Sequence, residues 1–324
     1  MPSSTPSYHR MAQPTTAYTK RAPSPPTILI PPTRWDLPMK VVPSYANVNT
    51  ASLNREDLGV ITQNALELVG ADSAMNWTYE SRRDAHAILD YLYLGPSSIA
   101  RNREWLREHG ITMILAARDV RHAGLNIMAF DKLAQEMGIE ARYVDVSGYH
   151  ELIRAFPSTV QMINDHMLRI YREQAVETSD SNVQNGTMVI DKTTFNRGRV
   201  LLFCETGNDR SAALASAYLM AVFGMSTVQV CQFIMYKRFC VTLAEELKQT
   251  LRAYEDILLA ERTVHQQELQ RSGLTHSVPK KAKRRFDETL DVDGDDGMTG
   301  MDPYQSSDRD RFLGRTNFVP FIDA

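Results

Sequence analysis

The fold of this chain is decided by residues 201–214, which read LLFCETGNDRSAAL. An apolar run of strand length leads into a short polar turn, and an apolar run of helical length follows the turn. The turn contains Cys204, Gly207 and Arg210, and Ser211 stands at the start of the second run. A turn of this composition between a strand and a helix predicts a site for an anion such as phosphate.

The spacing of these residues has a mechanical reason. If the strand ends at Phe203 and the helix begins near Arg210, the backbone N–H groups of the loop can turn inward around an anion, beside the positive end of the helix dipole. Gly207 permits the positive φ that such a turn requires, and the planar guanidinium of Arg210 can bond two phosphate oxygens at once. We therefore predict a phosphate site made of the Arg210 side chain and the backbone amides of Glu205, Thr206, Gly207, Asn208, Asp209 and Arg210.

Cys204 stands at the first position of this loop, where the positive field favours the thiolate form of a cysteine. A thiolate there can attack phosphorus and form a thiophosphate intermediate. The competing interpretation is a small buried hydrophobic residue, which is the role that we assign to Cys231 and Cys240 because they lie in or beside apolar helical stretches. Three cysteines without a C-x-x-C pair indicate neither a disulfide framework nor a zinc ribbon, and they favour a reducing compartment.

The composition is that of an ordinary globular chain with room for one domain and two tails. Of the 324 residues, 43% are hydrophobic and 23% are charged, and the net charge is −3. This balance indicates neither nucleic acid nor an anionic membrane as a partner. The longest apolar run, residues 212–225, is shorter than the roughly 20 residues that cross a bilayer, and the first residues lack the apolar core of a secretory signal.

Composition also divides the chain into three regions. Residues 1–75 are rich in proline, serine and threonine, with one helix-like patch at 54–69, and we expect a mostly disordered tail. Residues 76–266 carry the periodic pattern of an ordered domain, interrupted by an insertion loop or extra hairpin at about 174–198. Residues 267–324 contain a basic cluster and an acidic run, and we expect a second disordered tail.

Within the ordered region, short apolar runs alternate with stretches of helical periodicity. The run ITMILAA at 111–117 shows no polar alternation, which indicates a strand covered on both faces. Strands that alternate with helices predict an α/β domain with a largely parallel sheet. The expected strands are 87–94 (a strand pair or one strand with a turn), 111–117, 141–146 and 200–203, and the expected helices are 102–109, 129–137, 156–170, 211–223, 226–236 and 244–266.

Five further segments, together with the loop, resemble the dual-specificity branch of the cysteine-based protein tyrosine phosphatases, and within it the STYX group of phosphatase-like proteins. They are NWTYESRRDAHAIL at 76–89, YLGPSS at 93–98, HGITMI at 109–114, AFP at 155–157 and GMSTVQVCQFIMYKRFC at 224–240. The resemblance covers about residues 75–261, and the segments follow the family order.

The resemblance implies a cysteine-phosphatase α/β fold, in which a mostly parallel twisted sheet is flanked by helices. It implies a phosphoprotein substrate or ligand, and catalysis without a metal or another cofactor. By this resemblance Cys204 is the nucleophile, Arg210 holds phosphate, and the hydroxyl of Ser211 helps the thiolate to leave in the second step. Ser211 also suits the N-cap of the following helix.

The chain departs from the family pattern at functional positions. STYX proteins lack the nucleophilic cysteine, whereas this chain keeps Cys204, which favours an enzyme. Active members usually have histidine before the cysteine, where this chain has Phe203. Their general-acid aspartate corresponds to Gly148, and the loss of a general acid typically costs about 10²- to 10⁴-fold in rate. Asp145 is a nearby alternative acid, and an ordinary strand-end residue is the competing interpretation.

Two acids, Glu205 and Asp209, lie in the loop itself. The Glu205 side chain is expected to point outward. Asp209 directly precedes Arg210, and this D-R-S order resembles the loops of myotubularin-type and Sac-type phosphoinositide phosphatases, in which the aspartate is thought to be the general acid. Two alternatives stay open: Asp209 replaces the acid that is missing at Gly148, or it has drifted in an inactive site.

Three functions therefore follow from the sequence. The first is a phosphatase of the dual-specificity type that acts on phosphotyrosine or phosphoserine/threonine in proteins, with Asp209 or Asp145 as the acid. The second is a pseudophosphatase that binds or scaffolds phosphoproteins without useful turnover. A phosphoinositide phosphatase is the third, and it rests on the D-R-S order alone.

The tails carry two further signals. The cluster KKAKRR at 280–285 fits a nuclear localisation signal, and we expect the protein in the nucleus, the cytoplasm or both. The segment RFLGRTNFVPFIDA at 311–324 collects apolar residues after an acidic stretch. It is typical of a docking peptide for a partner or for the chain's own surface, and a free end is the alternative.

Overall fold

The computed structural model describes residues 25–32, 39–43, 53–65, 68–70, 77–123, 130–174, 176–177, 188–189 and 195–273. The chain divides into two units, Met1–Gly273 and Leu274–Ala324, and every described residue belongs to the first. The basic cluster at 280–285 and the segment 311–324 lie outside the described residues.

Five strands form one mixed sheet in the order β3-β4-β9-β5-β6. Their bounds are β3 His86–Leu89, β4 Leu92–Pro96, β5 Met113–Asp119, β6 Glu140–Val146 and β9 Val200–Cys204. β3 and β4 pair antiparallel, as expected for the predicted strand pair, and the other pairings are parallel. The structure confirms the predicted α/β fold with a largely parallel sheet.

The central strand β9 lies between β4 and β5, and all of its residues are buried. Its side chains alternate between two apolar layers, with Cys204 in one layer and Phe203 in the other. Burial on both faces explains why the residues of β9 before Cys204 form an uninterrupted apolar run. It also places Cys204 and Phe203 on opposite faces of the sheet.

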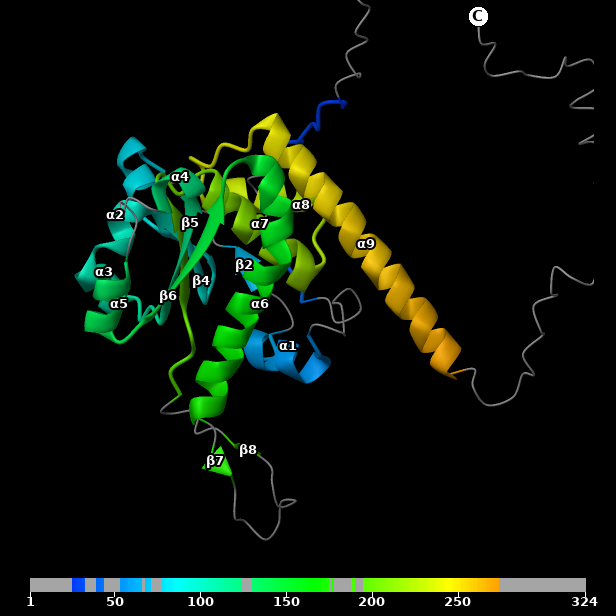
Figure 1. The fold of residues 1–324 in the computed structure, drawn as a ribbon, viewed down its shortest axis with the longest axis horizontal. Coiled ribbons are helices and arrows are strands. Elements are labelled where there is room, and N and C mark those ends of the chain that lie inside the picture. The colour runs from blue at the N-terminus through cyan, green and yellow to red at the C-terminus, as the bar shows by residue number, and fades with distance from the viewer. Residues whose placement is uncertain are drawn as a thin grey trace, which may run out of the picture. The chain divides into compact units, whose positions relative to one another are not determined.

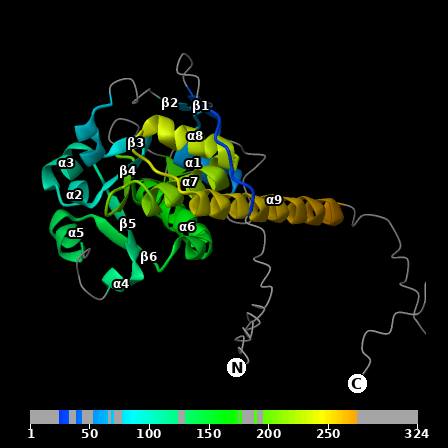
Figure 2. The same cartoon turned by 90° about the horizontal axis from the view of Figure 1, so that it is seen from above.

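Helices cover both faces of the sheet (Figures 1 and 2). The face of Cys204 packs against α6 (Tyr149–Gln174), α7 (Arg210–Phe223), α8 (Thr227–Lys237) and α9 (Glu245–Gly273). The face of Phe203 packs against α2 (Ser97–Ala100), α3 (Arg103–Glu108) and α5 (Asp131–Met137). A short α4 (Val120–Ala123) follows β5, and a 3-10 helix η1 (Tyr79–Arg83) precedes β3.

The boundaries between α7 and α8 agree with local sequence signals, and the start of α6 is an exception. α7 ends where Gly224 adopts φ +67°, and the N-cap of α8 is Ser226, whose side chain forms a capping box with Gln229. The exception is α6, which begins at Tyr149 instead of near Phe156. Its first turn is mostly polar and only partly buried, so the apolar pattern from which we expected this helix begins late.

The N-terminal region differs from the tail that we expected over residues 1–75. Its described residues include α1 (Arg55–Thr62) and a strand pair of β1 (Met39–Val41) with β2 (Leu68–Gly70). Leu58 and Ile61 of α1 are each 1% exposed and belong to the same core as the sheet. Apolar residues of this region are therefore buried against the domain. The average composition of the segment does not reveal this burial.

The predicted insertion and the end of the domain also have described parts. β7 (Val176–Glu177) pairs antiparallel with β8 (Met188–Val189), in agreement with the hairpin alternative. α9 continues to Gly273, beyond the expected end at residue 266. Among the described residues, no helix combines the length and the apolar character needed to cross a membrane, and these residues contain no group of three or more side chains that could hold a metal ion.

Candidate active site

The predicted loop joins the carboxyl end of β9 to the N-terminus of α7, and Gly207 fixes its shape. Gly207 adopts φ +77°, and a Cβ atom there would lie 2.4 Å from the carbonyl carbon of Gly95 in β4. A side chain is excluded both by this close approach and by the left-handed backbone conformation. The loop can therefore pack directly against the backbone at the end of β4.

Cys204 points into this loop and has polar partners, although it is fully buried. Its Sγ atom accepts hydrogen bonds from the backbone N–H of Gly207 (3.2 Å) and from the hydroxyl of Ser211 (3.1 Å). Its thiol also donates to Oδ1 of Asp209 (3.1 Å). These polar contacts distinguish Cys204 from a merely hydrophobic cysteine.

The Asp209 carboxylate makes three contacts at the centre of the site. Besides Cys204, its Oδ1 accepts from the backbone N–H of Arg210 (2.7 Å), and its Oδ2 accepts from the hydroxyl of Tyr149 (3.4 Å). The Arg210 amide is one of the groups that we predicted to face phosphate. In this state the carboxylate of the chain itself therefore occupies part of the predicted anion site.

The Arg210 side chain is held by an acid that sequence reasoning did not identify. An Nη atom of Arg210 lies 3.0 Å from Oδ2 of Asp119, the last residue of β5, whose side chain is only 2% exposed. Arg121 also binds this carboxylate with its backbone N–H and guanidinium. Hydrogen bonds from Arg121, with a further contribution from the charge of Arg210, hold the pKa of Asp119 well below its usual range.

A second residue missed from the sequence, Arg238, anchors the loop from behind and is 0% exposed. Its Nε donates to the carbonyl of Gly207 (3.2 Å) and to the side chain of Asn208 (3.3 Å), and an Nη donates to the carbonyl of Thr206 (3.4 Å). Its remaining partners are the Asp84 carbonyl (2.6 Å), the Arg82 carbonyl (2.9 Å) and Nδ1 of His86 (2.7 Å). A charged residue at the end of an otherwise apolar helix was the available signal.

The segment after α8 also supports the loop. The thiol of Cys240 donates to the side chain of Asn208 (3.3 Å), and the backbone N–H of Thr242 donates to the Asn208 carbonyl (3.2 Å). The Glu205 side chain is exposed, as expected.

The structure does not bring Asp145 to the site, and this corrects its assignment as an alternative acid. Arg118 binds both carboxylate oxygens of Asp145, at 2.6 and 2.8 Å, and stacks on Tyr143. Side chains alternate along a strand, so Asp145 shares the face of Tyr143, whereas its neighbour Val144 packs in the layer of Cys204. Asp145 and Cys204 therefore lie on opposite faces of the sheet.

The other two departures from the family pattern are also visible. Phe203 packs edge to face on Phe130, with 4.7 Å between ring centroids, so its position offers no polar group to the loop. Gly148 immediately precedes α6, and the next residue, Tyr149, supplies the hydroxyl that reaches Asp209. A phenol linked to the loop thus stands next to the position at which relatives carry an acid.

The model of the family described as "Dual specificity phosphatase, catalytic domain" matches residues 92–257, just over half of the chain. The chain belongs to the dual specificity phosphatase family. Among its relatives is the mouse protein named serine/threonine/tyrosine-interacting protein, 29% identical over 225 residues that cover 68% of this chain and 87% of the mouse protein. The human protein of that name is 28% identical over the same shares.

A solved structure is also similar to this phosphatase family member. The crystal structure of the human tyrosine phosphatase-like serine/threonine/tyrosine-interacting protein covers 55% of this chain and 99% of that chain, with 28% identity and a TM-score of 0.41. The chain thus resembles both phosphatases and a protein named for interaction.

Replacing Arg238 by methionine should lower the free energy of unfolding by roughly 2–5 kcal/mol, because several buried acceptors lose their donor together. Urea denaturation measures this loss. The matched control is Arg252→Met, the same change at an arginine whose side chain is 55% exposed, and it should stay within about 0.5 kcal/mol of the unchanged protein. Equal losses in the two variants would contradict the anchoring role of Arg238.

The free energy of unfolding should also fall as the pH is lowered from about 6.5 towards 4. Burial, with help from the charge of Arg238, lowers the pKa of His86 from 6.5 to about 4, so in this window the unfolded chain binds a proton that the folded chain does not. Urea denaturation at pH 7.5 and 5.0 measures the difference. His86→Asn, which does not titrate, should show a smaller decrease, and an unchanged decrease would refute the assignment.

Proposed function

We propose that this protein is a cysteine-dependent phosphatase that removes phosphate from tyrosine or serine/threonine in phosphoproteins. The observation that carries the proposal is the environment of Cys204, whose sulfur accepts hydrogen bonds from the Gly207 amide and the Ser211 hydroxyl at the N-terminus of a buried helix. In this proposal Arg210 and the loop amides bind the phosphoryl oxygens. Cys204 is the nucleophile.

The contact between Cys204 and Asp209 supplies a route for the proton. Asp209 takes the proton of the Cys204 thiol, and the thiolate attacks phosphorus. The leaving oxygen lies opposite the sulfur in an in-line displacement, so Asp209 moves away from Cys204 and returns the same proton to that oxygen as its bond to phosphorus breaks. Water then attacks the thiophosphate and gives a proton to Asp209, while Ser211 donates a hydrogen bond to the departing sulfur. One carboxylate thereby serves as base and acid in place of the acid missing at Gly148.

Substrate binding requires two rearrangements in this scheme. A phosphate oxygen must replace Asp209 on the Arg210 amide, because two anions repel by about 1 kcal/mol at 4 Å in water and by about 4 kcal/mol near a protein surface. The guanidinium of Arg210 must also turn towards the phosphate. One Nη atom either stays bonded to Asp119 during this movement or leaves it. Ion pairing with Asp119 limits the orientations of Arg210 before substrate arrives.

The second candidate is a pseudophosphatase that binds phosphoproteins without turning them over. It is favoured by the Asp209 carboxylate on the Arg210 amide, which competes with phosphate, and by the relatives named for interaction. The phosphoinositide alternative has less support, because Glu205 and Asp209 bring negative charge to a site that would face several phosphates at once.

Single-turnover release of phosphate from an activated aryl phosphate tests the first candidate, with the full-length protein. We expect a burst that Cys204→Ser abolishes. Asp209→Asn should lower turnover about 10²- to 10⁴-fold while tungstate binding stays equal or becomes tighter, since a competing anion is removed. Turnover that Asp209→Asn leaves unchanged would rule out the proton route but not the nucleophile.

The same experiment separates the two candidates. No burst, together with phosphotyrosine peptide binding that Arg210→Ala removes, would establish the pseudophosphatase and overturn the enzyme. If the unchanged protein shows neither a burst nor peptide binding, both candidate functions are overturned.

We also propose that the protein enters the nucleus through the basic cluster at 280–285, with the segment 311–324 available for a partner. Imaging of a tagged chain in which the five basic residues Lys280, Lys281, Lys283, Arg284 and Arg285 are replaced by alanine should show it excluded from the nucleus. An unchanged distribution would remove the support for a nuclear signal.

A further inference from the structure

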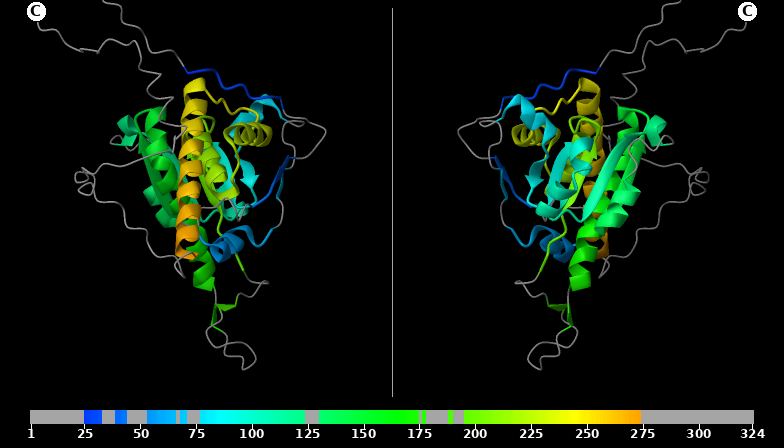
Figure 3. Two further views of the ribbon diagram at one scale, coloured as in Figure 1. Left: turned by 90° about the vertical axis from the view of Figure 1, so that its right-hand side faces the viewer. Right: turned by 90° about the vertical axis from the view of Figure 1, so that its left-hand side faces the viewer.

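An extended segment, residues 25–32 (PPTILIPP), lies along α8 and the first turns of α9, where Figure 3 shows it in blue. Four hydrogen bonds join its main chain to side chains of the two helices. Gln249 donates to the carbonyl of Pro26 (2.7 Å), Lys248 donates to the carbonyl of Ile28 (2.7 Å), Glu245 accepts from the N–H of Ile28 (2.7 Å), and Gln232 donates to the carbonyl of Pro31 (2.8 Å). We call this surface of α8 and α9 the strap groove.

The hydrogen bonds of the strap groove go to the main chain of the bound segment, so they depend on its extended conformation more than on its sequence. Glu245 and Lys248, themselves an ion pair at 2.5 Å, bind both the N–H and the carbonyl of Ile28, as the edge of a β-sheet would. Prolines at both ends of the segment favour the extended backbone. Any extended chain can make these main-chain contacts.

The side chains of the segment add a simple preference. Ile28 and Ile30 are half-buried, and Ile30 packs against the core, whereas Leu29 between them is 81% exposed. Alternate residues of an extended chain face the same side. The strap groove therefore selects aliphatic residues at alternate positions between prolines.

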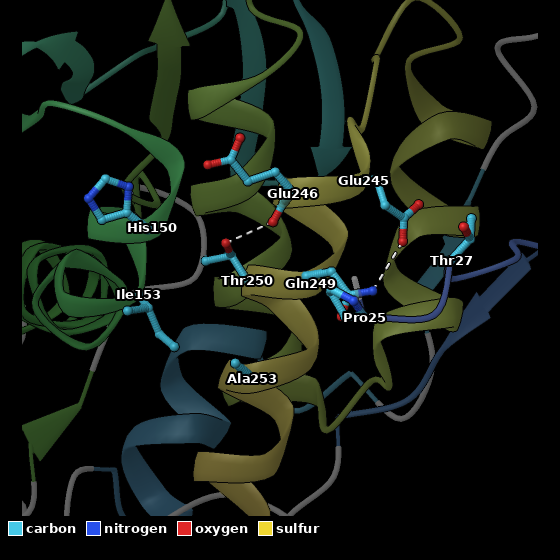
Figure 4. A pocket seen from close by; sticks show the side chains of 9 residues that line it. All are labelled: Pro25, Thr27, His150, Ile153, Glu245, Glu246, Gln249, Thr250 and Ala253. Atoms are coloured by element: carbon cyan, nitrogen blue, oxygen red, sulfur yellow. Dashed lines mark hydrogen bonds between the residues drawn. The ribbon is translucent and has the colours of Figure 1, made fainter. Parts of the chain in front are cut away.

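The groove continues into a cavity of about 610 Å³ beyond the start of the described segment (Figure 4). Pro25 and Thr27 line one side of it, and the opposite walls come from His150 and Ile153 of α6 and from the first turns of α9. Glu246, an exposed residue of α9, places a carboxylate at this cavity. A longer ligand gains contacts here that the described residues of the segment do not make.

The charge of the cavity indicates what a longer ligand should carry. Glu245 and Glu246 both line the cavity, and Glu245 already has Lys248 as a partner. A cation in the ligand would complement these carboxylates, whereas an acidic residue would be repelled. His150 adjoins Tyr149, the residue bonded to Asp209, so the cavity is linked through α6 to the candidate active site.

We propose that the strap groove is a docking site for an extended, proline-flanked aliphatic segment of a partner protein, with a basic residue placed in the adjoining cavity, and that residues 25–32 occupy the groove until the partner displaces them. A segment tethered within the same chain acts at an effective concentration of about 1 mM. If the segment itself binds the groove with an intrinsic Kd of about 1–10 μM, it weakens the binding of a partner by roughly 10²- to 10³-fold.

The test uses the full-length protein and a fluorescent peptide with the sequence of residues 20–33, KRAPSPPTILIPPT. The release variant, Ile28→Asp with Ile30→Asp, should bind the peptide at least tenfold more tightly than the unchanged protein by fluorescence anisotropy. Leu29→Asp is the matched control, and it should leave binding unchanged because Leu29 faces solvent. Adding Gln232→Ala and Gln249→Ala to the release variant should abolish the gain.

Several outcomes would overturn the docking site. They are a release variant without any gain, an equal gain in the Leu29 control, and a gain that the two glutamine substitutions leave intact. A second release variant, Ile28→Ala with Ile30→Ala, keeps the test decisive if the aspartates impair folding. A peptide whose first two residues are glutamate should bind at least fivefold more weakly, and equal binding would refute the basic preference.

Light scattering identifies a competing occupant. If the unchanged protein is a dimer and the peptide dissociates it, two copies of the chain exchange this segment. That result would overturn the proposal that the groove binds a partner protein. Because none of these variants alters the loop of Cys204, the outcome is independent of whether the protein has phosphatase activity.

Discussion

The candidate site depends on one buried guanidinium. Arg238 is 0% exposed, and it ties the loop carbonyls of Thr206 and Gly207 to the backbone that leads into β3. These bonds turn the loop carbonyls away from the centre and leave the N–H groups for Cys204 and for an anion. An arginine can do this because its planar fork offers five donors in fixed directions, which a lysine cannot match.

The same loop brings opposing charges together at short range. Cys204 accepts hydrogen bonds from two donors, yet an oxygen of the Asp209 carboxylate lies 3.1 Å from its sulfur. Arg210 is likewise shared between a phosphate that it would bind and the buried Asp119 that holds it now. Such an arrangement is productive if the proton moves between Cys204 and Asp209, and inhibitory if it does not. In the proposed function, the choice between enzyme and binding module therefore depends on this carboxylate.

The cavity beside the strap groove and the candidate site both contact the first turn of α6. Tyr149 contacts the loop through Asp209, and His150, the next residue, lines the cavity beside the strap groove. This turn stands where the relatives' acid-bearing loop would lie, after Gly148. The two residues directly after Gly148 therefore contribute to the contacts of the loop and to the wall of the cavity.

The sequence by itself determined the α/β fold, the order of its elements and the loop from Cys204 to Ser211, because these follow from local apolar periodicity and from the spacing of a single turn. Tertiary structure alone decided the rest. Asp119, Tyr149 and Arg238 reach the loop from distant parts of the chain, and Asp145 is excluded by the face of β6 on which it lies. Residues 25–32 and α1 join the domain through contacts with helices far along the chain. Such contacts depend on which elements pack together, and no local pattern records that.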